Sequence, residues 1–321
     1  MHEFLERIGL ELPIVQAGMG GGIAGSALAT AVSAAGGLGT LGTAGPSRMA
    51  AWLAEVRQAT DKPIAMNLLL PFARAAHWKV AAQADVVVTF WGRPQRFSTG
   101  VWIHQVGTVA ESRAAFDAGA DAVIVQGVEA GGHVRGTVPA LELLEQTRAA
   151  LPAGYPILLA GGIADANDVE GALAAGAAAV VAGTRFVMSD ESGAAPEYKV
   201  RLANGSETVL TELFGVGWPG AHRVLRNGAT ERWLRHDQRG PAVVRGINRL
   251  TAPALARVPE ALQQWTSRHQ LVALPFFAPV PPTGSMNGRI LETAPLYAGE
   301  TVARITDIAP AASIVRSLTP G

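Results

Sequence analysis

Short apolar stretches alternate with longer segments of helical apolar spacing along the first 184 residues of the chain. Short apolar runs of this kind are typical of buried strands, and the intervening spacing is typical of amphipathic helices. The alternation predicts a series of βα units. Eight strands are predicted, at residues 13–18, 37–42, 63–69, 86–91, 101–106, 122–127, 156–161 and 179–184.

Residues suited to helix ends support the same division. Ser47 and Asp165 stand where a side-chain oxygen can accept a hydrogen bond from the first turn of a helix, and Pro139 suits a first helical position. Gly119 and Gly176 follow predicted helices, where a left-handed residue favours glycine. Helices are therefore predicted at residues 26–35, 47–60, 109–118, 139–151 and 165–175.

Eight consecutive βα units indicate an α/β fold, a closed (β/α)8 TIM barrel. An open doubly wound sheet seldom needs so many short, evenly spaced parallel strands. We expect residues 1–188 to form the barrel, with an irregular fourth unit because residues 95–100 are too few for a covering helix. Residues 189–321 are expected to form an additional, mostly helical, lid-like subdomain and a C-terminal segment that packs against the barrel.

The composition agrees with an α/β enzyme and excludes a disordered chain. Of 321 residues, 49% are apolar, 16% are charged and 37 are glycine, whereas soluble domains usually carry about 25% charged residues. The 26 basic and 26 acidic side chains balance, so no net field favours nucleic acid or an anionic membrane as a partner. No membrane span and no signal peptide is recognisable, and a cytoplasmic location is expected.

The residue types that are missing exclude several chemistries. Cysteine is absent, which excludes disulfides, thiolate metal sites and the barrels that oxidise purine nucleotides through a catalytic cysteine. The lysines Lys62, Lys79 and Lys199 lie outside predicted strand ends, where a Schiff-base aldolase needs one. The histidines show no paired metal-ligand spacing, so no metal site is predicted.

Two glycine turns follow the seventh and eighth predicted strands, where barrels of this kind commonly hold phosphate. Gly161 and Gly162 precede Asp165, and we expect the following helix to offer free N–H groups to an anion. Gly183 and Thr184 add bare backbone and a hydroxyl donor. Either pair alone is more often a helix cap, but two such turns in these positions favour a cradle for a phosphomonoester.

The sixth predicted strand leads into a loop of glycines that ends in His133. A histidine titrates near neutral pH and can remove a proton from a carbon acid, so His133 is the candidate catalytic base. Glu129, four residues earlier, either orients His133 or caps a neighbouring backbone group. On the fifth strand, alternation lets only one of His104 and Gln105 face the barrel interior, and the sequence does not choose.

Further ligand contacts are expected at the other strand ends. Asn67 is a polar side chain at the end of the third strand, and Gln16 and Thr89 offer weaker versions of the same argument. The turn that begins with Ala17, Gly18 and Met19 is dense in glycine and allows a flat ring to lie against backbone. Three tryptophans, Trp91, Trp102 and Trp218, are assigned to core or interface and left out of the site.

These motifs together resemble the nitronate monooxygenases, formerly called 2-nitropropane dioxygenases, which are FMN-dependent (β/α)8 barrels. The resemblance rests on five segments and covers roughly the first 230 residues. They are residues 13–19 (PIVQAGM), 66–68 (MNL), 126–133 (QGVEAGGH), 160–163 (AGGI) and 183–186 (GTRF). The sequence departs from the family at Gly18, where proline is common, in the 89–94 segment, and at Val134 after the histidine loop.

The resemblance implies FMN as the cofactor and alkyl nitronates or nitroalkanes, with O2, as substrates. By that resemblance His133 is the base that takes the α-proton of a nitroalkane, and the products are a carbonyl compound and nitrite. A homodimer is left open. The residues expected to hold FMN, from the resemblance and from the glycine turns, are Ala17, Gly18, Met19, Asn67, Gln126, Gly131, Gly161, Gly162, Gly183 and Thr184.

Two alternatives stay open at this point. The flavin-dependent enoyl-acyl-carrier-protein reductases have a very similar Glu-Ala-Gly-Gly-His loop, and NAD(P)H:quinone reductases belong nearby. A reductase of either type is reduced by a nicotinamide. The other alternative is a flavin- or phosphate-binding barrel without catalysis, in which replacement of His133 would cost nothing measurable.

Overall fold

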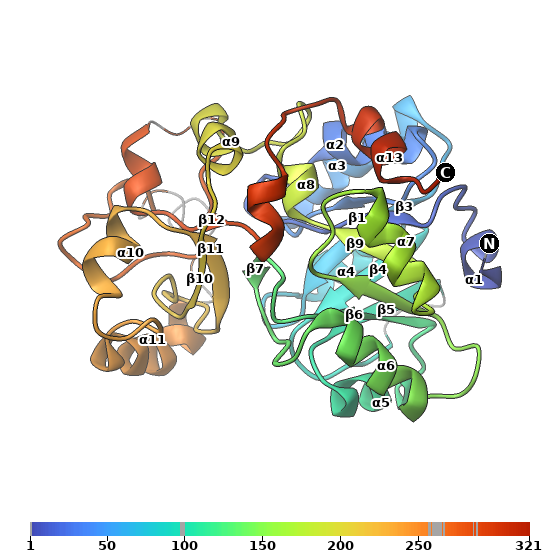
Figure 1. Cartoon of the computed structure of the whole chain (residues 1–321), viewed down its shortest axis with the longest axis horizontal. Helices are drawn as coiled ribbons and strands as arrows, with labels where there is room; N and C mark the ends of the chain where they lie inside the picture. Colours follow the sequence, from blue (N-terminus) through green and yellow to red (C-terminus); the bar gives the residue numbers. More distant parts are fainter. Residues whose placement is uncertain are drawn as a thin grey trace.

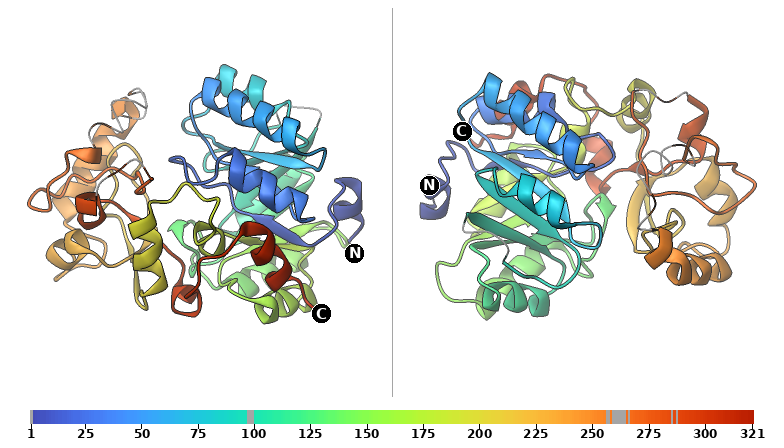
Figure 2. Two further views of the ribbon diagram at one scale, coloured as in Figure 1. Left: turned by 90° about the horizontal axis from the view of Figure 1, so that it is seen from above. Right: turned by 180° about the vertical axis from the view of Figure 1, so that it is seen from behind.

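The chain forms two lobes that lie side by side, with both termini on the larger lobe (Figures 1 and 2). The computed structural model describes residues 2–96, 100–255, 258, 265, 267–284, 286 and 288–321. The larger lobe contains the parallel sheet and its helices, and the smaller lobe contains short strands, helices and long connections.

The larger lobe is the predicted (β/α)8 barrel. Its eight parallel strands run in the order β1-β9-β8-β6-β5-β4-β3-β2. The circle closes between the first two strands, where Val15 bridges Leu38 and Leu38 N donates to Ile14 O at 2.9 Å. The strands are β1 (Ile14–Gln16), β2 (Gly39–Leu41), β3 (Ile64–Leu69), β4 (Val86–Phe90), β5 (Val101–Val106), β6 (Ala122–Gln126), β8 (Ile157–Ala160) and β9 (Ala179–Ala182).

The helices cover the outside of this barrel. All five predicted helices are present, and the sequence missed the seven-residue α4 and the four-residue α8, which are too short to show clear apolar periodicity. No helix joins β4 to β5 within the described part of that connection, as expected; residues 97–99 of the expected irregular unit lie outside the described residues. The helices are α2 (Ser26–Ala34), α3 (Pro46–Ala59), α4 (Ala75–Ala81), α5 (Val109–Asp117), α6 (Ala140–Ala150), α7 (Ala166–Ala174) and α8 (Thr184–Val187).

Apolar side chains fill the interior of the barrel at the end where its strands begin. Val88, Ile103 and Ile124 point inward from successive strands and are buried together. Phe4 and Leu5 of the short helix α1 (Glu3–Arg7) join this cluster and cover that end of the barrel. The end of the barrel at which the strands begin is therefore filled by side chains, and the cavity for a ligand is expected at the opposite end, where the strands terminate.

The smaller lobe is built around a second sheet that the sequence did not reveal. Strands β10 (Thr208–Thr211), β11 (His222–Leu225) and β12 (Leu296–Tyr297) are antiparallel. The two-residue strand β7 (Gly132–His133), which leaves the barrel after β6, pairs with β11. This pairing brings the histidine loop of the barrel and the smaller lobe together (Figure 1).

Helices flank this second sheet, and the chain then returns to the barrel. The helix α13 (Ala311–Leu318) buries Ile314, Val315 and Leu318 in the same cluster as the outer faces of the barrel strands. The other elements are α9 (Pro196–Ala203), α10 (Gly228–Trp233), α11 (Ala242–Leu255) and two 3-10 turns, η1 (Gly288–Glu292) and η2 (Glu300–Arg304). No helix among the described residues is long and apolar enough to cross a bilayer.

Candidate active site

One cavity of about 660 Å³ opens at the carboxyl ends of the barrel strands. This volume lies within the range of ~300 to 1,000 Å³ usual for ligand sites. All of the residues expected to bind the cofactor line it, and so does His133. The expected residues are Ala17, Gly18, Met19, Asn67, Gln126, Gly131, Gly161, Gly162, Gly183 and Thr184.

Bare backbone forms one end of this cavity, which we call the glycine end and define by Gly161, Gly162, Gly183 and Thr184. Gly161 and Gly162 have φ angles of 117° and 76°, which favour glycine. A Cβ atom at Gly183 would meet nothing closer than the Cβ of Ala17, at 3.8 Å. The missing side chains therefore leave open space, as a cradle for a bulky anion needs.

One expected feature of the glycine end is wrong. The N–H groups of Asn167 and Asp168 in the first turn of α7 are not free, because Asp165 Oδ1 accepts from them at 3.0 and 3.3 Å. Asp168 Oδ2 accepts from Ala164 N at 2.7 Å, and Arg304 pairs with both carboxylates. An anion at this end would therefore be held by the glycine backbone and not by this helix.

Asn67 and Gly18 form one wall of the cavity. Asn67 is buried, and its side chain lies against Gly18. The backbone carbonyl oxygen of Asn67 accepts a hydrogen bond from Thr43 Oγ1 at 2.8 Å. A Cβ atom at Gly18 would overlap the Asn67 side chain. Glycine is therefore required at position 18 by the close approach of Asn67.

Gln126 holds the histidine loop in place. Its Nε2 donates to the carbonyl oxygen of His133 at 2.9 Å, and its Oε1 accepts from the backbone N–H of Arg135 at 3.0 Å. Beyond this, His133 pairs with His222 in the register of β7 and β11. The backbone of His133 is thus held from the barrel and from the smaller lobe.

His133 lies among aromatic rings and is 7% exposed. Its ring stacks on Trp218, with centroids 3.5 Å apart and planes 9° from parallel, and Trp91 approaches edge-on at 6.1 Å. Burial, and then the neighbouring His222, hold the pKa of His133 well below its usual value, although a hydrogen bond with the backbone of Trp218 opposes this. The imidazole is therefore neutral at pH 7, the form that can accept a proton.

Glu129 makes no hydrogen bond with His133 in the described part of the chain. Its Oε1 accepts from the backbone N–H of Ala140, the first residue of α6, at 2.9 Å, and its backbone oxygen accepts from Glu300 N at 3.0 Å. Of the two roles left open by the sequence, the structure therefore shows the capping role.

The structure also resolves the alternation on β5. Gln105 lines the cavity, whereas His104 points outward and lies within hydrogen-bond distance, 2.7 Å, of Thr89 Oγ1. Thr89 Oγ1 also accepts a hydrogen bond from the indole N–H of Trp102 at 2.8 Å. Thr89 is buried and does not line the cavity, so its assignment as a ligand contact is wrong. Gln16 is likewise fully buried, and its Oε1 accepts from Thr40 N at 3.0 Å.

Sequence reasoning missed the residues that the smaller lobe and the C-terminal segment add to the cavity. Trp218, Tyr297, Gly299 and Thr301 all line it. Gly299 N donates to Thr184 Oγ1 at 3.0 Å, so the C-terminal segment lies beside the glycine end. Trp218 itself was the available signal, and a tryptophan in the sequence does not distinguish a core residue from a site residue.

The arrangement places a neutral, buried base beside a cavity that ends in a backbone cradle. The described part of the chain shows no candidate metal site. Clusters of three or more potential ligand side chains are absent from those residues. The phenol groups of the cavity are also engaged, since Tyr198 donates to Tyr297 O at 2.6 Å and Tyr297 donates to Pro279 O at 3.0 Å. His133 is therefore the side chain best placed for proton transfer.

Comparison with known families and proteins agrees with this geometry. A family model described as nitronate monooxygenase matches residues 2–96 and 95–321. A Mycobacterium tuberculosis protein named (3aS,4S,5R,7aS)-5-hydroxy-7a-methyl-1-oxo-octahydro-1H-indene-4-carboxyl-CoA dehydrogenase is 33% identical over 244 residues, which cover 71% of this chain and 66% of that protein. The nitronate monooxygenase of Pseudomonas aeruginosa is 31% identical over 271 residues, which cover 65% of this chain and 76% of that protein.

Solved structures show the same architecture over almost the whole chain. FabK from Thermotoga maritima superposes with a TM-score of 0.77 at 29% identity, covering 99% of this chain and 94% of that one. Nitroalkane oxidase from Streptomyces ansochromogenes superposes with a TM-score of 0.75 at 27% identity, covering 98% and 96%. The likeness therefore includes the smaller lobe as well as the barrel.

Proposed function

From the premise that this chain belongs to the nitronate monooxygenase family, we propose that it binds FMN and oxidises alkyl nitronates with O2 to a carbonyl compound and nitrite. Neutral nitroalkanes are substrates too, after His133 has removed their α-proton. The observation that carries the proposal is a neutral, buried histidine at the wall of a cavity that ends in a glycine cradle.

The residues of the cavity fit FMN. The glycine end has the open backbone that a phosphomonoester needs, and Gly183 faces space that a side chain would fill. Ala17, Gly18 and Met19 offer backbone against which a flat ring can lie, and the remaining wall comes from Asn67, Gln126 and Gly131. When bound, FMN supplies the redox chemistry between substrate and oxygen.

His133 supplies the proton transfer in this proposal. Its lowered pKa leaves a lone pair free at pH 7, so the imidazole can accept the α-proton of a nitroalkane. Gln126 and the β7–β11 pairing fix the loop that carries it. The imidazole of His133 is buried between the barrel and the smaller lobe. Exclusion of water strengthens the electrostatic interaction between the protonated imidazole and the developing negative charge of the nitronate.

A second candidate is a flavin-dependent reductase that oxidises NADH or NADPH. Two similarities favour it: the first-named relative is a CoA-thioester dehydrogenase, and FabK superposes well. Both candidates would use the same cavity, and they differ in the electron donor. We further propose a small-molecule substrate; the cytoplasmic location and the homodimer stay predictions.

Anaerobic mixing with a defined electron donor tests the proposal. Purified protein, reconstituted with FMN, is mixed with ethyl nitronate, with NADPH and with NADH, and the visible flavin absorption is followed. Bleaching by the nitronate alone, with nitrite released on admission of air, supports the nitronate reaction. Rapid bleaching by a nicotinamide alone would assign the chain to the reductases.

A further inference from the structure

Three buried polar atoms without partners lie in one group of rings, which we call the aromatic cluster and define by Trp91, His133 and Trp218. His133 Nε2 and the indole Nε1 atoms of Trp91 and Trp218 have no hydrogen-bond partner among the described residues and almost no contact with solvent. Buried polar groups are nearly always paired, and leaving one unpaired is costly. Three such atoms in one cluster indicate that it has another state in which they find partners.

The rings block access to His133 in the structure. Trp218 lies flat on the imidazole at a centroid distance of 3.5 Å, and Trp91 meets Trp218 edge-on at 5.5 Å. The guanidinium carbon of Arg135 lies over the ring of Trp91, 4.8 Å from its centroid, and this contact helps to hold the ring in place. Because Nε2 is sealed, a substrate cannot reach it unless a ring of the cluster moves.

Trp218 is the ring best placed to move. It lies at the tip of the loop between β10 and β11, next to Gly217, whose φ angle is 78°, and close to Gly215 and Gly220. By contrast, Trp91 packs against Gly220, where a Cβ atom would lie 2.7 Å from the indole ring. Glycines on both sides of Trp218 give the tip conformational freedom.

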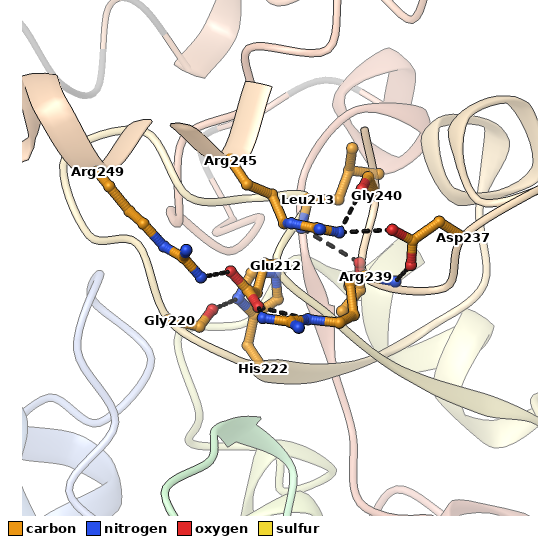
Figure 3. Close-up of polar contacts among 10 residues, drawn as sticks. Glu212, Leu213, Gly220, His222, Asp237, Arg239, Gly240, Arg245 and Arg249 are labelled. Carbon is orange, nitrogen blue, oxygen red and sulfur yellow. Dashed lines mark hydrogen bonds and ion pairs between the residues drawn. The ribbon is translucent and has the colours of Figure 1, made fainter. Parts of the chain in front are cut away.

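The base of the same loop is held firmly (Figure 3). Glu212 pairs with Arg249 at 2.8 Å and with Arg239. His222 Nε2 accepts from Phe214 N at 3.1 Å, and its Nδ1 lies 2.9 Å from Gly220 O. Movement is thereby confined to the short tip that carries Trp218.

A second cavity provides space for the indole ring. This side cavity, of about 490 Å³, is lined by Trp91, Gly217, Trp218 and Pro219 among others. Trp218 also lines the main cavity, so its ring forms part of the boundary between the two. A swing of the ring toward the side cavity would uncover His133.

We propose that Trp218 is a gate over His133: it covers the imidazole in the closed form, swings toward the side cavity when substrate binds, and thereby sets which substrates reach the base. In the open form its indole N–H becomes available to an acceptor oxygen of the substrate. The substrate selection rests on the proposed function, whereas the covering of His133 does not.

Chemical labelling tests the gate without relying on catalysis. The unaltered protein, Trp218→Ala and Trp218→Phe are treated with diethyl pyrocarbonate, and labelling of each histidine is followed by peptide mass spectrometry. Exposed His236 is the internal reference. The rate at His133, relative to His236, should rise about tenfold or more in Trp218→Ala and change little in Trp218→Phe, whose ring still covers the imidazole.

Two controls separate gating from loss of structure. Trp233→Ala removes a tryptophan from the same lobe, whose indole N–H donates to Val272 O at 2.7 Å, and should leave the His133 rate unchanged. Fully buried His222 should stay protected in every variant unless the lobe unfolds. An unchanged His133 rate in Trp218→Ala, or a rise at His133 matched by a rise at His222, would overturn the gate.

Substrate selection gives the second readout. For Trp218→Ala, kcat/KM with 2-phenylnitroethane relative to nitroethane should rise about tenfold over the unaltered protein, because the gate no longer excludes the larger group. An equal fall for both substrates contradicts a selective role. If no nitroalkane is turned over by any variant, the proposed function fails, and the labelling result still decides whether Trp218 covers His133.

Discussion

The two ends of the cavity differ in what forms them: backbone at one end and aromatic side chains at the other. The glycine end consists of backbone from turns that directly follow β8 and β9, and it is open. The aromatic cluster consists of side chains from the residue that follows β4, from β7 and from the β10–β11 loop, and it is closed around unpaired polar atoms. One end is ready to receive a ligand, whereas the other must rearrange before a substrate can react.

This difference indicates a division of labour. A cofactor that stays bound is suited to a rigid cradle, since nothing has to move when it is held. A substrate that enters and leaves in every turnover needs a part of the site that opens, and such parts are taken from less tightly held loops. Replacements at the glycine end should therefore change cofactor content, and replacements at the aromatic cluster should change reactivity.

The largest expected effect is at the glycine end. Gly183→Asp would place a carboxylate in the space facing Ala17 and repel the phosphate, so the purified protein should lose its flavin. The measurement is the ratio of visible to protein absorption after purification in the presence of FMN.

Gly171→Asp is the matched control for this replacement. Gly171 lies exposed on α7, and a Cβ atom there would meet nothing within 4 Å. The control should keep its full flavin content. Equal flavin in both variants would show that the glycine end does not hold the phosphate.

At the aromatic cluster, His133→Ala should keep the flavin and lose activity toward neutral nitroalkanes. Removal of a general base typically costs roughly 10²- to 10⁴-fold in rate. Steady-state oxygen consumption with nitroethane and with pre-formed ethyl nitronate measures the effect. The nitronate, which needs no deprotonation, should suffer much less, and a similar loss for both would contradict the assignment of the base.

Acid should destabilise the protein through its buried histidines. Burial is the main cause that lowers the pKa of both His104 and His222 to about 4, and it also lowers that of His133. Because unfolded histidines take up protons near pH 6.5, stability is lost as the pH falls from there toward 4. Between pH 7 and 5, His104 and His222 should each cost roughly 2 kcal/mol of unfolding free energy.

Urea unfolding of the unaltered protein and of His222→Gln at pH 7 and pH 5 measures this linkage. The variant lacks one of the buried titrating groups, so its stability should fall less between the two pH values. The same fall in both proteins would contradict the stated origin of the acid sensitivity.

The smallest expected effect is on the pH profile. Since burial lowers the pKa of His133, the acid limb of kcat/KM for nitroethane should lie below pH 6.5. Trp218→Ala lets water reach the imidazole, so the limb should move upward toward the ordinary histidine value. If the acid limbs of the two proteins coincide, the Trp218 ring does not lower the pKa of His133.

The sequence predicts the glycine end well because its signals are local. A strand, a Gly-Gly pair and a helix start lie within a few residues of one another at Gly161, and a strand is followed by a Gly-Thr pair at Gly183. The one local error, the free helix N-terminus, arose because the carboxylates of Asp165 and Asp168 accept hydrogen bonds from the N–H groups of Ala164, Asn167 and Asp168.

The aromatic cluster lies beyond such reasoning. Trp91, His133 and Trp218 come from separate parts of the chain and meet only because β7 pairs with β11. Strands of two to four residues carry too few positions for a period-two pattern, so neither the second sheet nor the covering of His133 was visible. A tryptophan in a loop is equally compatible with core packing and with a site.

The central claim is that this chain takes electrons from a nitronate through a flavin held in the barrel. Anaerobic stopped-flow mixing of the FMN-loaded protein with ethyl nitronate, and separately with NADPH and NADH, tests it most directly. The account predicts rapid flavin bleaching with the nitronate, little with either nicotinamide, and nitrite once oxygen is admitted. Rapid bleaching by NADPH or NADH with none by the nitronate would contradict it.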